Sequence, residues 1–522
     1  MAPHKAAALA STRCAPLAYA STWALVMGML RVINVCSMLG QQTYVCQNEG
    51  TSAPLSMRTL RIALFLCLLH ATTATQHLWS SDPSAPPWAA GHSPRESLSP
   101  LRVIVTTRST GTNAVHAACN HSESAAEHAC AFLLAGTCRH VYSGSAMHGF
   151  AGSFTPAQLR QLHACAPDLM LRIENDAAVT VAASPAAAPL PTLSLPVSTP
   201  WHLDRIDQAQ LPLDGVLHTS PKAGSGVHVY IIDSGVRGTH HEFNNSFGRV
   251  AQDADFTDAP FPNAAPSHDC DGHGTHVAAT VGGVNVGIAP GAKLHSIRVL
   301  DCNGSGSISD VVAGIDYVAS QAKLPAVAVL SLGVPAGDWS VALETAVTRL
   351  VAAGVFVTVA AGNGQSDACR IVPASVPQAF TVGASDLPLR LRTPGTVPSG
   401  VSDTLYSWTD SGSCLSLFAP GVDIISACGG GNRCGVVSDT SYAIASGTSM
   451  AAPHVAGAAA AYLGTHPSAT PAQVKAALLA SATRSTITGT MLPGTPNALL
   501  MYSWAGVVNS TQPVAAMSTS LH

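Results

Sequence analysis

One stretch of this chain decides how the rest of it is interpreted: residues 446–457 read SGTSMAAPHVAG. Ser449 lies where a glycine-rich loop enters an alanine-rich helical segment, so we expect its hydroxyl near the positive end of a helix. A serine hydroxyl is a poor nucleophile until a general base removes its proton. The rest of the sequence must therefore supply a base if Ser449 is to react.

Two further motifs supply a base and an acid. Residues 271–277, DGHGTHV, place His273 between two glycines at the start of a helical segment, and imidazole titrates near neutrality. Residues 229–235, VYIIDSG, place Asp233 directly after an apolar strand, where it can fix the tautomer of the base. The candidate catalytic residues are Asp233, His273 and Ser449.

Asn363 follows another apolar strand and completes the set. A tetrahedral oxyanion needs hydrogen-bond donors, which the Asn363 amide and the backbone N–H of Ser449 can provide as an oxyanion hole. The chain order is acid, base, nucleophile, whereas α/β-hydrolase esterases run nucleophile, acid, base and carry Gly-x-Ser-x-Gly. Here Ala451 stands at the fifth position of that window. The order excludes an esterase of that fold.

Apolar runs alternate with helical segments after residue 200. Near-continuous Val, Ile and Leu runs indicate strands that are buried on both faces, and their alternation with helices indicates a parallel sheet with right-handed crossovers. We therefore expect an α/β fold with a doubly wound, mainly parallel sheet, preceded by a small α+β domain. The predicted strands are 227–232, 294–300, 326–332, 355–360 and 379–382.

Together these motifs resemble the signatures of the subtilases, serine proteases of the peptidase S8 type. The likeness rests on GHGTH (272–276) and GTSMAAPH (447–454), and LDRIDQ (203–208), VLDCNGSGS (299–307) and GTPN (494–497) extend it toward the proteinase K and aqualysin branch. The resemblance implies a subtilisin-like catalytic domain over residues 201–505 with serine endopeptidase activity on polypeptide substrates.

The same resemblance implies two strand edges that hold a substrate by β-augmentation. Val334 stands where the family usually has a further glycine, which puts the shape of the neighbouring subsite in question. The implied substrate-binding residues are Gly304, Ser305, Gly306, Ser331, Leu332 and Gly333.

The chain before residue 200 is predicted to direct export and to form an inhibitor. Residues 57–75 have the pattern of a secretory signal peptide, since their apolar run is too short for a membrane span of about 20 residues; a signal anchor is the alternative. Residues 101–185 resemble the inhibitor-type propeptide of subtilases, and an unrelated binding module is the alternative. Residues 186–200 are a proline-rich linker expected to contain the processing site. We assign no role to residues 1–56, because Met57 is an alternative start, and residues 506–522 form a C-terminal tail.

Composition limits the partners. Charged residues make up 10% of the chain and its formal net charge is -4, without runs of one sign, so a nucleic-acid surface is not indicated. We expect a secreted, extracellular monomer that is inhibited by its own propeptide and has no membrane association after signal removal. The competing class is a catalytically silent subtilase-like binding protein kept shut by its propeptide.

The catalytic segment contains an even number of cysteines, which suits an oxidising compartment. The resemblance implies the pairs Cys270 with Cys302 and Cys369 with Cys414, and the closeness of Cys428 and Cys434 suggests a short loop pair. We expect loss of the first pair to lower both stability and turnover, and loss of Cys428 and Cys434 to lower stability alone. No C-x-x-C motif indicates zinc.

Calcium is the cofactor that the sequence raises, as a structural ion with no part in catalysis. Four oxygen-bearing residues match a calcium-binding region of aqualysin-like enzymes, and a solvated acidic surface is the alternative. A second site of the family departs here, because Ser416 stands at a ligand aspartate near Pro377. The candidate ligands are Asp204, Asp207, Gln208 and Asp214.

Overall fold

The computed structural model describes the following residues: 43–44, 55–56, 99–108, 119, 138–165, 170–181, 192–194, 198–243, 248–258, 269–335, 337–395, 402–429, 431–435 and 438–502. Residues 1–96 and 97–522 form two separate units. Within the first unit β1 (Thr43–Tyr44) and β2 (Leu55–Ser56) form an antiparallel pair. The predicted signal peptide and C-terminal tail lie outside the described residues.

An eleven-stranded, mainly parallel sheet forms the centre of the second unit. Every neighbouring pair from β10 to β23 is parallel, and β21 closes the sheet antiparallel to β23. β17 (Asp403–Leu405) and β22 (Ile487–Thr488) extend it beside β16. In sheet order the other strands are β10 (Val250–Asp255), β11 (Lys293–Arg298), β9 (His228–Asp233), β13 (Ala326–Leu330), β15 (Val355–Ala360), β16 (Phe380–Asp386), β18 (Leu417–Pro420), β23 (Ala498–Leu499) and β21 (Thr483–Arg484).

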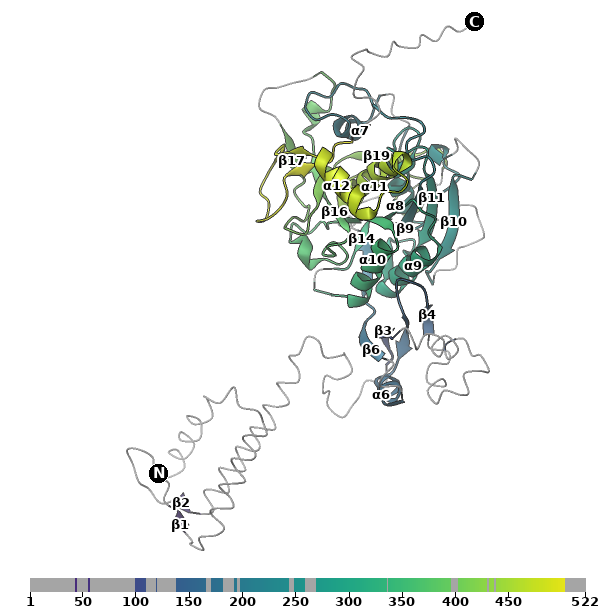
Figure 1. The fold of residues 1–522 in the computed structure, drawn as a ribbon, viewed down its shortest axis with the longest axis vertical. Helices are drawn as coiled ribbons and strands as arrows, with labels where there is room; N and C mark the ends of the chain where they lie inside the picture. Colours follow the sequence, from purple (N-terminus) through teal and green to yellow (C-terminus); the bar gives the residue numbers. More distant parts are fainter. Residues whose placement is uncertain are drawn as a thin grey trace. The chain divides into compact units, whose positions relative to one another are not determined.

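Helices cover both faces of this sheet, as Figure 1 shows. α9 (Ile308–Gln321) and α10 (Val341–Ala352) pack on one face, and α8 (His273–Gly282), α11 (Thr448–Thr465) and α12 (Pro471–Ser481) pack on the other. Because β13 and β15 are buried along their whole length, both faces need apolar side chains, which explains their unbroken Val, Leu and Ala runs. The predicted doubly wound α/β fold is confirmed.

The sheet order explains how distant motifs meet. β9, β13 and β15 are parallel neighbours, so their carboxyl ends lie at one edge of the sheet. β9 ends at Asp233, Ser331 follows β13, and Asn363 lies three residues after β15. The candidate acid, one substrate edge and the candidate oxyanion donor are therefore brought to the same place.

A small antiparallel sheet precedes this α/β unit. Its strands pair in the order β4 (Cys138–Tyr142), β5 (Gly149–Phe154), β3 (Leu101–Thr107) and β6 (Met170–Asn175). A helix follows as α6 (Pro156–Cys165), where Thr155 Oγ1 accepts the N–H of Gln158 at 3.2 Å. Residues 114–134 have a helical composition, and they lie outside the described residues apart from residue 119. Nowhere in the described part of the chain is a helix both long and apolar enough to cross a membrane.

Candidate active site

A buried acid–base pair lies at the carboxyl end of β9. Nδ1 of His273 lies 2.8 Å from Oδ1 of Asp233, and each residue is 1% exposed. Asp233 Oδ1 also accepts the backbone N–H of Ser234 at 2.7 Å. The carboxylate therefore holds the imidazole ring through one nitrogen and leaves Nε2 directed elsewhere.

Glycine allows His273 to reach Asp233. A Cβ on Gly274 would lie 2.0 Å from the carbonyl oxygen of Gly235, so only glycine lets the first turn of α8 approach the turn after β9 this closely. Gly272, on the other side of the histidine, has φ 106°, a conformation that other residues rarely adopt. The two glycines that flank the base are thus required by its position.

Asp269 holds the same turn in place and is not among the residues predicted from the sequence. Its carboxylate accepts the Ser234 hydroxyl at 3.0 Å, the backbone N–H groups of Asp271, Gly272 and Thr275, and the Thr275 hydroxyl. Burial, and then the nearby charge of Asp271, raise the pKa of Asp269 to about 6. An acidic residue four positions before the candidate base was the available signal.

Ser449 lies in the first turn of α11. Helix N–H groups in this turn have no acceptor within the helix, so the backbone N–H of Ser449 can serve an oxyanion. Asn363 Oδ1 accepts the N–H of Thr448 at 2.9 Å, which fixes the amide beside the same helix end. The two candidate oxyanion donors therefore come from adjacent positions around Ser449.

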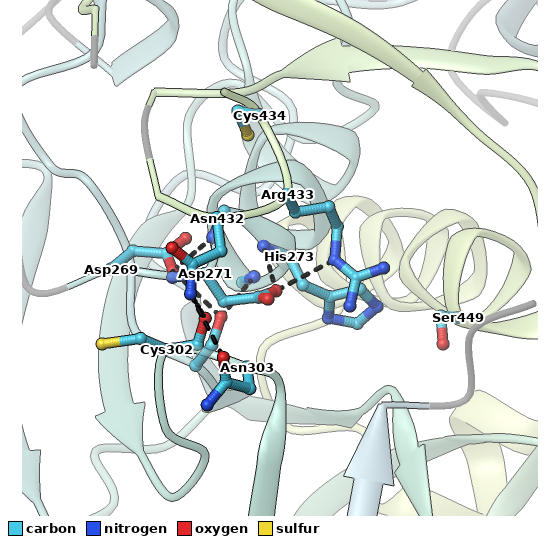
Figure 2. Close-up of polar contacts among 12 residues, drawn as sticks. Asp269, Asp271, His273, Cys302, Asn303, Asn432, Arg433, Cys434 and Ser449 are labelled. Carbon is cyan, nitrogen blue, oxygen red and sulfur yellow. Dashed lines mark hydrogen bonds and ion pairs between the residues drawn. The ribbon is translucent and has the colours of Figure 1, made fainter. Parts of the chain in front are cut away.

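The ring of His273 points toward Ser449 in Figure 2, but the two are not hydrogen-bonded. The Ser449 hydroxyl donates to the carbonyl oxygen of Ser331 at 3.1 Å, and Nε2 of His273 has no hydrogen-bond partner among the described residues. Catalytic hydrogen bonds are often made only in the complex with substrate. Ser449 would have to turn its hydroxyl from Ser331 to Nε2 before reaction.

His276, in the same turn as the candidate base, is buried and anchors backbone. Its Nε2 lies 3.1 Å from the Ile424 oxygen and 3.3 Å from the Ala443 oxygen, and these carbonyls lie on the neighbouring β19 (Ile424–Ala427) and β20 (Tyr442–Ala445). Burial lowers the pKa of this ring to about 3. His276 therefore remains neutral and does not face Ser449 as a base.

The implied substrate edges face each other across a strand of the same chain. β7 (Ala178–Val181) pairs antiparallel with β12 (Ser305–Ser307) on one side and with β14 (Leu332–Gly333) on the other. The N–H of Val181 also donates to the carbonyl of Gly304 at 2.9 Å. The six implied substrate-binding residues therefore lie around a segment that β7 occupies.

Two acidic residues before β7 cap helices of the α/β unit. Asp176 accepts the backbone N–H and the hydroxyl of Ser309 at the start of α9, both at 2.8 Å. Glu174 accepts the hydroxyl of Ser340 and the N–H of Ala342 at the start of α10. Carboxylates at helix N-termini stabilise such contacts, so the small sheet docks on α9 and α10 through matched charge.

The structure contains three disulfides in the α/β unit, joining Cys270 to Cys302, Cys369 to Cys414 and Cys428 to Cys434. A further bridge joins Cys119 to Cys138 beside the small sheet. The Cys270 bridge links the loop of His273 to the segment before β12. Its position ties the candidate base to one substrate edge.

The four candidate calcium ligands lie near the end of α7 (Trp201–Ile206). Asp204 accepts the N–H groups of Asp214 and Gly215, and Asp207 Oδ2 accepts the N–H of His218. The other oxygen of Asp207 is buried and has no partner in the described part of the chain, and burial raises the pKa of Asp207 to about 6. A desolvated, unpartnered carboxylate oxygen fits a hard cation, although no group of three His, Cys, Asp or Glu among the described residues is arranged around one point as metal ligands.

The second family site does not fit a metal ion. Lys475, on α12, donates from Nζ to the carbonyl oxygens of Pro377 and Ala379, each at 3.1 Å. The ammonium also lies 5.9 Å from the ring centre of Phe380. A cation supplied by the chain therefore satisfies these carbonyls, beside the segment where Ser416 pairs with Thr381.

A family model described as the subtilase family, Peptidase S8, matches residues 224–499, more than half of the chain. The chain therefore belongs to the subtilase family, and the resemblance inferred from its motifs is confirmed.

Particular relatives share much of the chain. An extracellular serine proteinase of Thermus sp. (strain Rt41A) is 47% identical over 287 residues, 55% of this chain and 62% of the relative. An alkaline serine exoprotease A of Vibrio alginolyticus is 40% identical over 67% of this chain and 58% of the relative. Proprotein convertase subtilisin/kexin type 9 of Rattus norvegicus is 36% identical over 60% of this chain and 43% of the relative. The chain thus spans less than two thirds of the length of each.

A solved structure is also similar. It is described as a cold adapted subtilisin-like serine proteinase, is 43% identical, and superposes with a TM-score of 0.49 over 58% of this chain and 97% of the other.

Proposed function

We propose that this chain is a secreted serine endopeptidase that hydrolyses peptide bonds of polypeptides through an acyl-enzyme, and that it is made as a zymogen. The observation that carries the proposal is the buried contact of 2.8 Å between Nδ1 of His273 and Oδ1 of Asp233. The ring of His273 points toward Ser449, which lies in the first turn of α11 (Figure 2). The names of two relatives, extracellular serine proteinase and alkaline serine exoprotease, agree with secretion and with a serine nucleophile.

The proposed chemistry assigns one role to each group. Nε2 of His273 takes the proton of the Ser449 hydroxyl as its oxygen attacks the substrate carbonyl, and Asp233 stabilises the imidazolium that results. The Asn363 amide and the Ser449 N–H donate to the oxyanion. The imidazolium then protonates the leaving amine, and a water molecule activated by the same ring hydrolyses the acyl-enzyme.

The position of β7 supports inhibition by the chain's own propeptide. A substrate that binds by β-augmentation needs two free strand edges, and β7 occupies both β12 and β14. The carboxylate caps of Asp176 and Glu174 on α9 and α10 hold the small sheet beside this strand. The propeptide proposal therefore rests on a segment that competes with substrate for the same hydrogen bonds.

The register of β7 supports one bond as the processing site. Thr180 pairs with Gly333 and Val181 with Leu332, so the next antiparallel step leads to Ser331, whose carbonyl accepts the Ser449 hydroxyl. The residue after Val181 is Ala182. We therefore propose that the first cut falls between Ala182 and Ala183, before the linker of residues 186–200 to which the sequence analysis assigned it.

Expression of the precursor and of its Ser449→Ala variant, without other proteases, tests the proposal. The wild-type chain is expected to mature to a product whose amino-terminal residue is Ala183, and to react with a fluorophosphonate probe at Ser449. The variant is expected to remain uncut and unlabelled, because the same hydroxyl performs both reactions. Amino-terminal sequencing and intact mass measure the first outcome, and peptide mapping of the probe measures the second.

The outcomes separate the parts of the proposal. A wild-type protein that takes up no probe and cuts no peptide would contradict the enzyme and favour the silent binding protein. Normal maturation of the Ser449→Ala variant would remove autoprocessing alone. A Ser449-dependent cut at another bond would overturn only the assignment to Ala182.

We also propose that calcium binds as a structural ion at the Asp207 cluster. The support is the unpartnered buried oxygen of Asp207, together with burial that raises the pKa of both Asp204 and Asp207 and so disfavours their ionised forms without a cation.

A further inference from the structure

The Cys428–Cys434 disulfide closes a short loop that contacts the segment before His273 and the segment before β12. We call residues 428–435 the clasp loop; its residue 430 lies outside the described residues. Both cysteines are buried. The N–H of Asn432 donates to the carbonyl of Cys270 at 3.0 Å, and its side-chain amide donates to the carbonyl of Cys302 at 2.7 Å.

Glycine permits this close contact. Gly431 has φ 89°, and a Cβ there would lie 2.1 Å from the carbonyl oxygen of Cys270. The next contact is the N–H of Arg433, which donates to the carbonyl of Asp271 at 2.9 Å. The clasp loop is therefore fixed by backbone contacts at the point where it presents the side chain of Arg433.

That side chain extends beside the candidate base, as Figure 2 shows. Nε of Arg433 donates to Oδ1 of Asp271 at 3.0 Å, and the same oxygen accepts the N–H of His273 at 3.1 Å. The side chain is 23% exposed. Within the described part of the chain neither Nη atom makes a hydrogen bond, so Asp271 occupies one edge of the guanidinium and leaves donors for another acceptor.

The remaining part of the guanidinium lies next to the strand that occupies the cleft. Nη2 of Arg433 is 3.2 Å from the position that a Cβ on Gly304 would take, and both methyl groups of Val181 lie within 3.2 Å of the same point. Val181 is 8% exposed and bonded through its N–H to Gly304. Arg433 thus lines the subsite that holds the Val181 side chain.

We propose that Arg433 is a specificity-determining residue that favours a carboxylate on the substrate residue bound at the position of Val181. The inference rests on the proposed function, and by the register of β7 this residue is the second one before the bond that is cut. Aspartate has nearly the shape of valine, so it would present two oxygens where Val181 has two methyl groups. A guanidinium binds a carboxylate through charge-assisted, directional hydrogen bonds, which a neutral amide of the same shape cannot match.

Paired peptide substrates test this assignment in the mature enzyme. The peptides have alanine before the cut bond and differ one position earlier, with aspartate against asparagine and lysine against glutamine. We expect kcat/KM to be about tenfold higher for aspartate than for asparagine, which corresponds to about 1.4 kcal/mol, and lower for lysine than for glutamine. In Arg433→Gln the aspartate-to-asparagine ratio is expected to fall to about one, and the lysine-to-glutamine ratio is expected to rise to about one.

The ratio within one enzyme cancels any common loss of activity. Arg390→Gln, which removes an exposed arginine from η5 (Leu389–Leu391), is the charge-matched control and is expected to keep both ratios. A Cys428→Ser/Cys434→Ser variant is expected to reduce the aspartate preference, because the clasp loop would no longer fix the guanidinium.

Each outcome decides the assignment. Equal rates for aspartate and asparagine in the wild-type enzyme would overturn it even if Arg433→Gln fails to fold, as would an unchanged ratio in that variant. A uniform loss of rate with an unchanged ratio would leave Arg433 with a positioning role only. Absence of hydrolysis of every peptide would instead contradict the proposed function.

Discussion

In the proposed mechanism two N–H donors stabilise the oxyanion, and Asn363 supplies the one that mutation can remove. Its Oδ1 accepts the N–H of Thr448, which fixes the amide beside the start of α11. Because the oxyanion develops only in the transition state, Asn363→Ala should lower kcat and leave KM nearly unchanged. Loss of the equivalent donor in subtilisin costs about 10²–10³ in rate, and we expect the same here.

Single-turnover kinetics with an ester and a peptide substrate measure this prediction, because they separate acylation from binding. Asn363→Asp is the matched variant, since it keeps the shape but places a negative charge beside the oxyanion and should be slower still. An unchanged acylation rate in Asn363→Ala would remove the residue from the mechanism.

Two buried histidines lie in contact with each other, His202 on α7 and His454 on α11, the helix that also carries Ser449. Nδ1 of His454 lies 2.7 Å from the carbonyl of Met450, and its Nε2 lies 2.8 Å from Nδ1 of His202. Burial lowers the pKa of His454 to about 4 and that of His202 well below its usual value. Both rings are therefore neutral in the folded protein.

This pair should make the fold sensitive to acid. Between about pH 6.5 and pH 4 an unfolded histidine binds a proton that His454 does not, so stability is complete above this window and falls as the pH drops through it. Each such ring contributes up to about a tenfold rise in the unfolding constant per pH unit. Thermal unfolding of the Ser449→Ala protein, which cannot digest itself, measures the slope. His202→Leu should flatten the slope, and the exposed His466→Gln should leave it unchanged; a slope that is equal in all three proteins would contradict this account.

At the scale of elements, two disulfides act on the loop that delivers His273 to α8. The Cys270–Cys302 bridge joins this loop to the segment before β12, and the clasp loop adds backbone contacts to Cys270 and Asp271. From the sequence, loss of Cys428 and Cys434 is expected to affect stability alone. Their loop contacts Cys270 and Asp271, and Asp271 in turn accepts the N–H of His273, so we now expect an effect on turnover from both bridges.

Serine substitutions of each pair test this expectation. Cys270→Ser/Cys302→Ser should destabilise the fold by roughly 2 to 4 kcal/mol and lower kcat together. The Cys369–Cys414 bridge closes a loop of similar length, with a sequence separation of 45 against 32. Cys369→Ser/Cys414→Ser should therefore lower stability without lowering kcat. Denaturant unfolding and active-site-titrated kinetics provide the two readouts. Equal losses of kcat in both variants would show that turnover follows general stability rather than the position of the base.

Across the whole molecule, the sequence predicts those contacts that are local in the chain or that follow from the pairing of parallel strands. Asp233, Ser331 and Asn363 could be placed together because parallel neighbours end at one edge. The contact of Arg433 with Asp271 spans 162 residues and follows from no periodicity, motif or strand pairing. This contact depends on the path of the clasp loop, which lies between the predicted strands and helices.

The two cation sites, at the Asp207 cluster and at the carbonyls of Pro377 and Ala379, differ in how far the sequence predicts them. The candidate calcium ligands near Asp207 lie close together in the chain, so they could be proposed from sequence alone. Lys475 donates to the carbonyls of Pro377 and Ala379, which are 98 and 96 residues away in the chain. From the sequence, only the departure of Ser416 from the family pattern is visible. The structure supplies the reason, because the α12 ammonium takes the place of a metal ion at these carbonyls.

Calcium should therefore stabilise this protein at one site only. In the Ser449→Ala background, added calcium should raise the melting temperature by an amount that grows with ln(1 + [Ca²⁺]/Kd), and Asp207→Asn should abolish the response. Lys475→Met should lower the melting temperature with or without calcium, because it leaves two carbonyls without their donor.

Adding Ser416→Asp to Lys475→Ala should create a new calcium response, since it pairs those carbonyls with a carboxylate beside Thr381. Differential scanning calorimetry in calcium and in chelator measures all four proteins. A calcium response that survives Asp207→Asn would contradict the assignment of the ion to the Asp207 cluster.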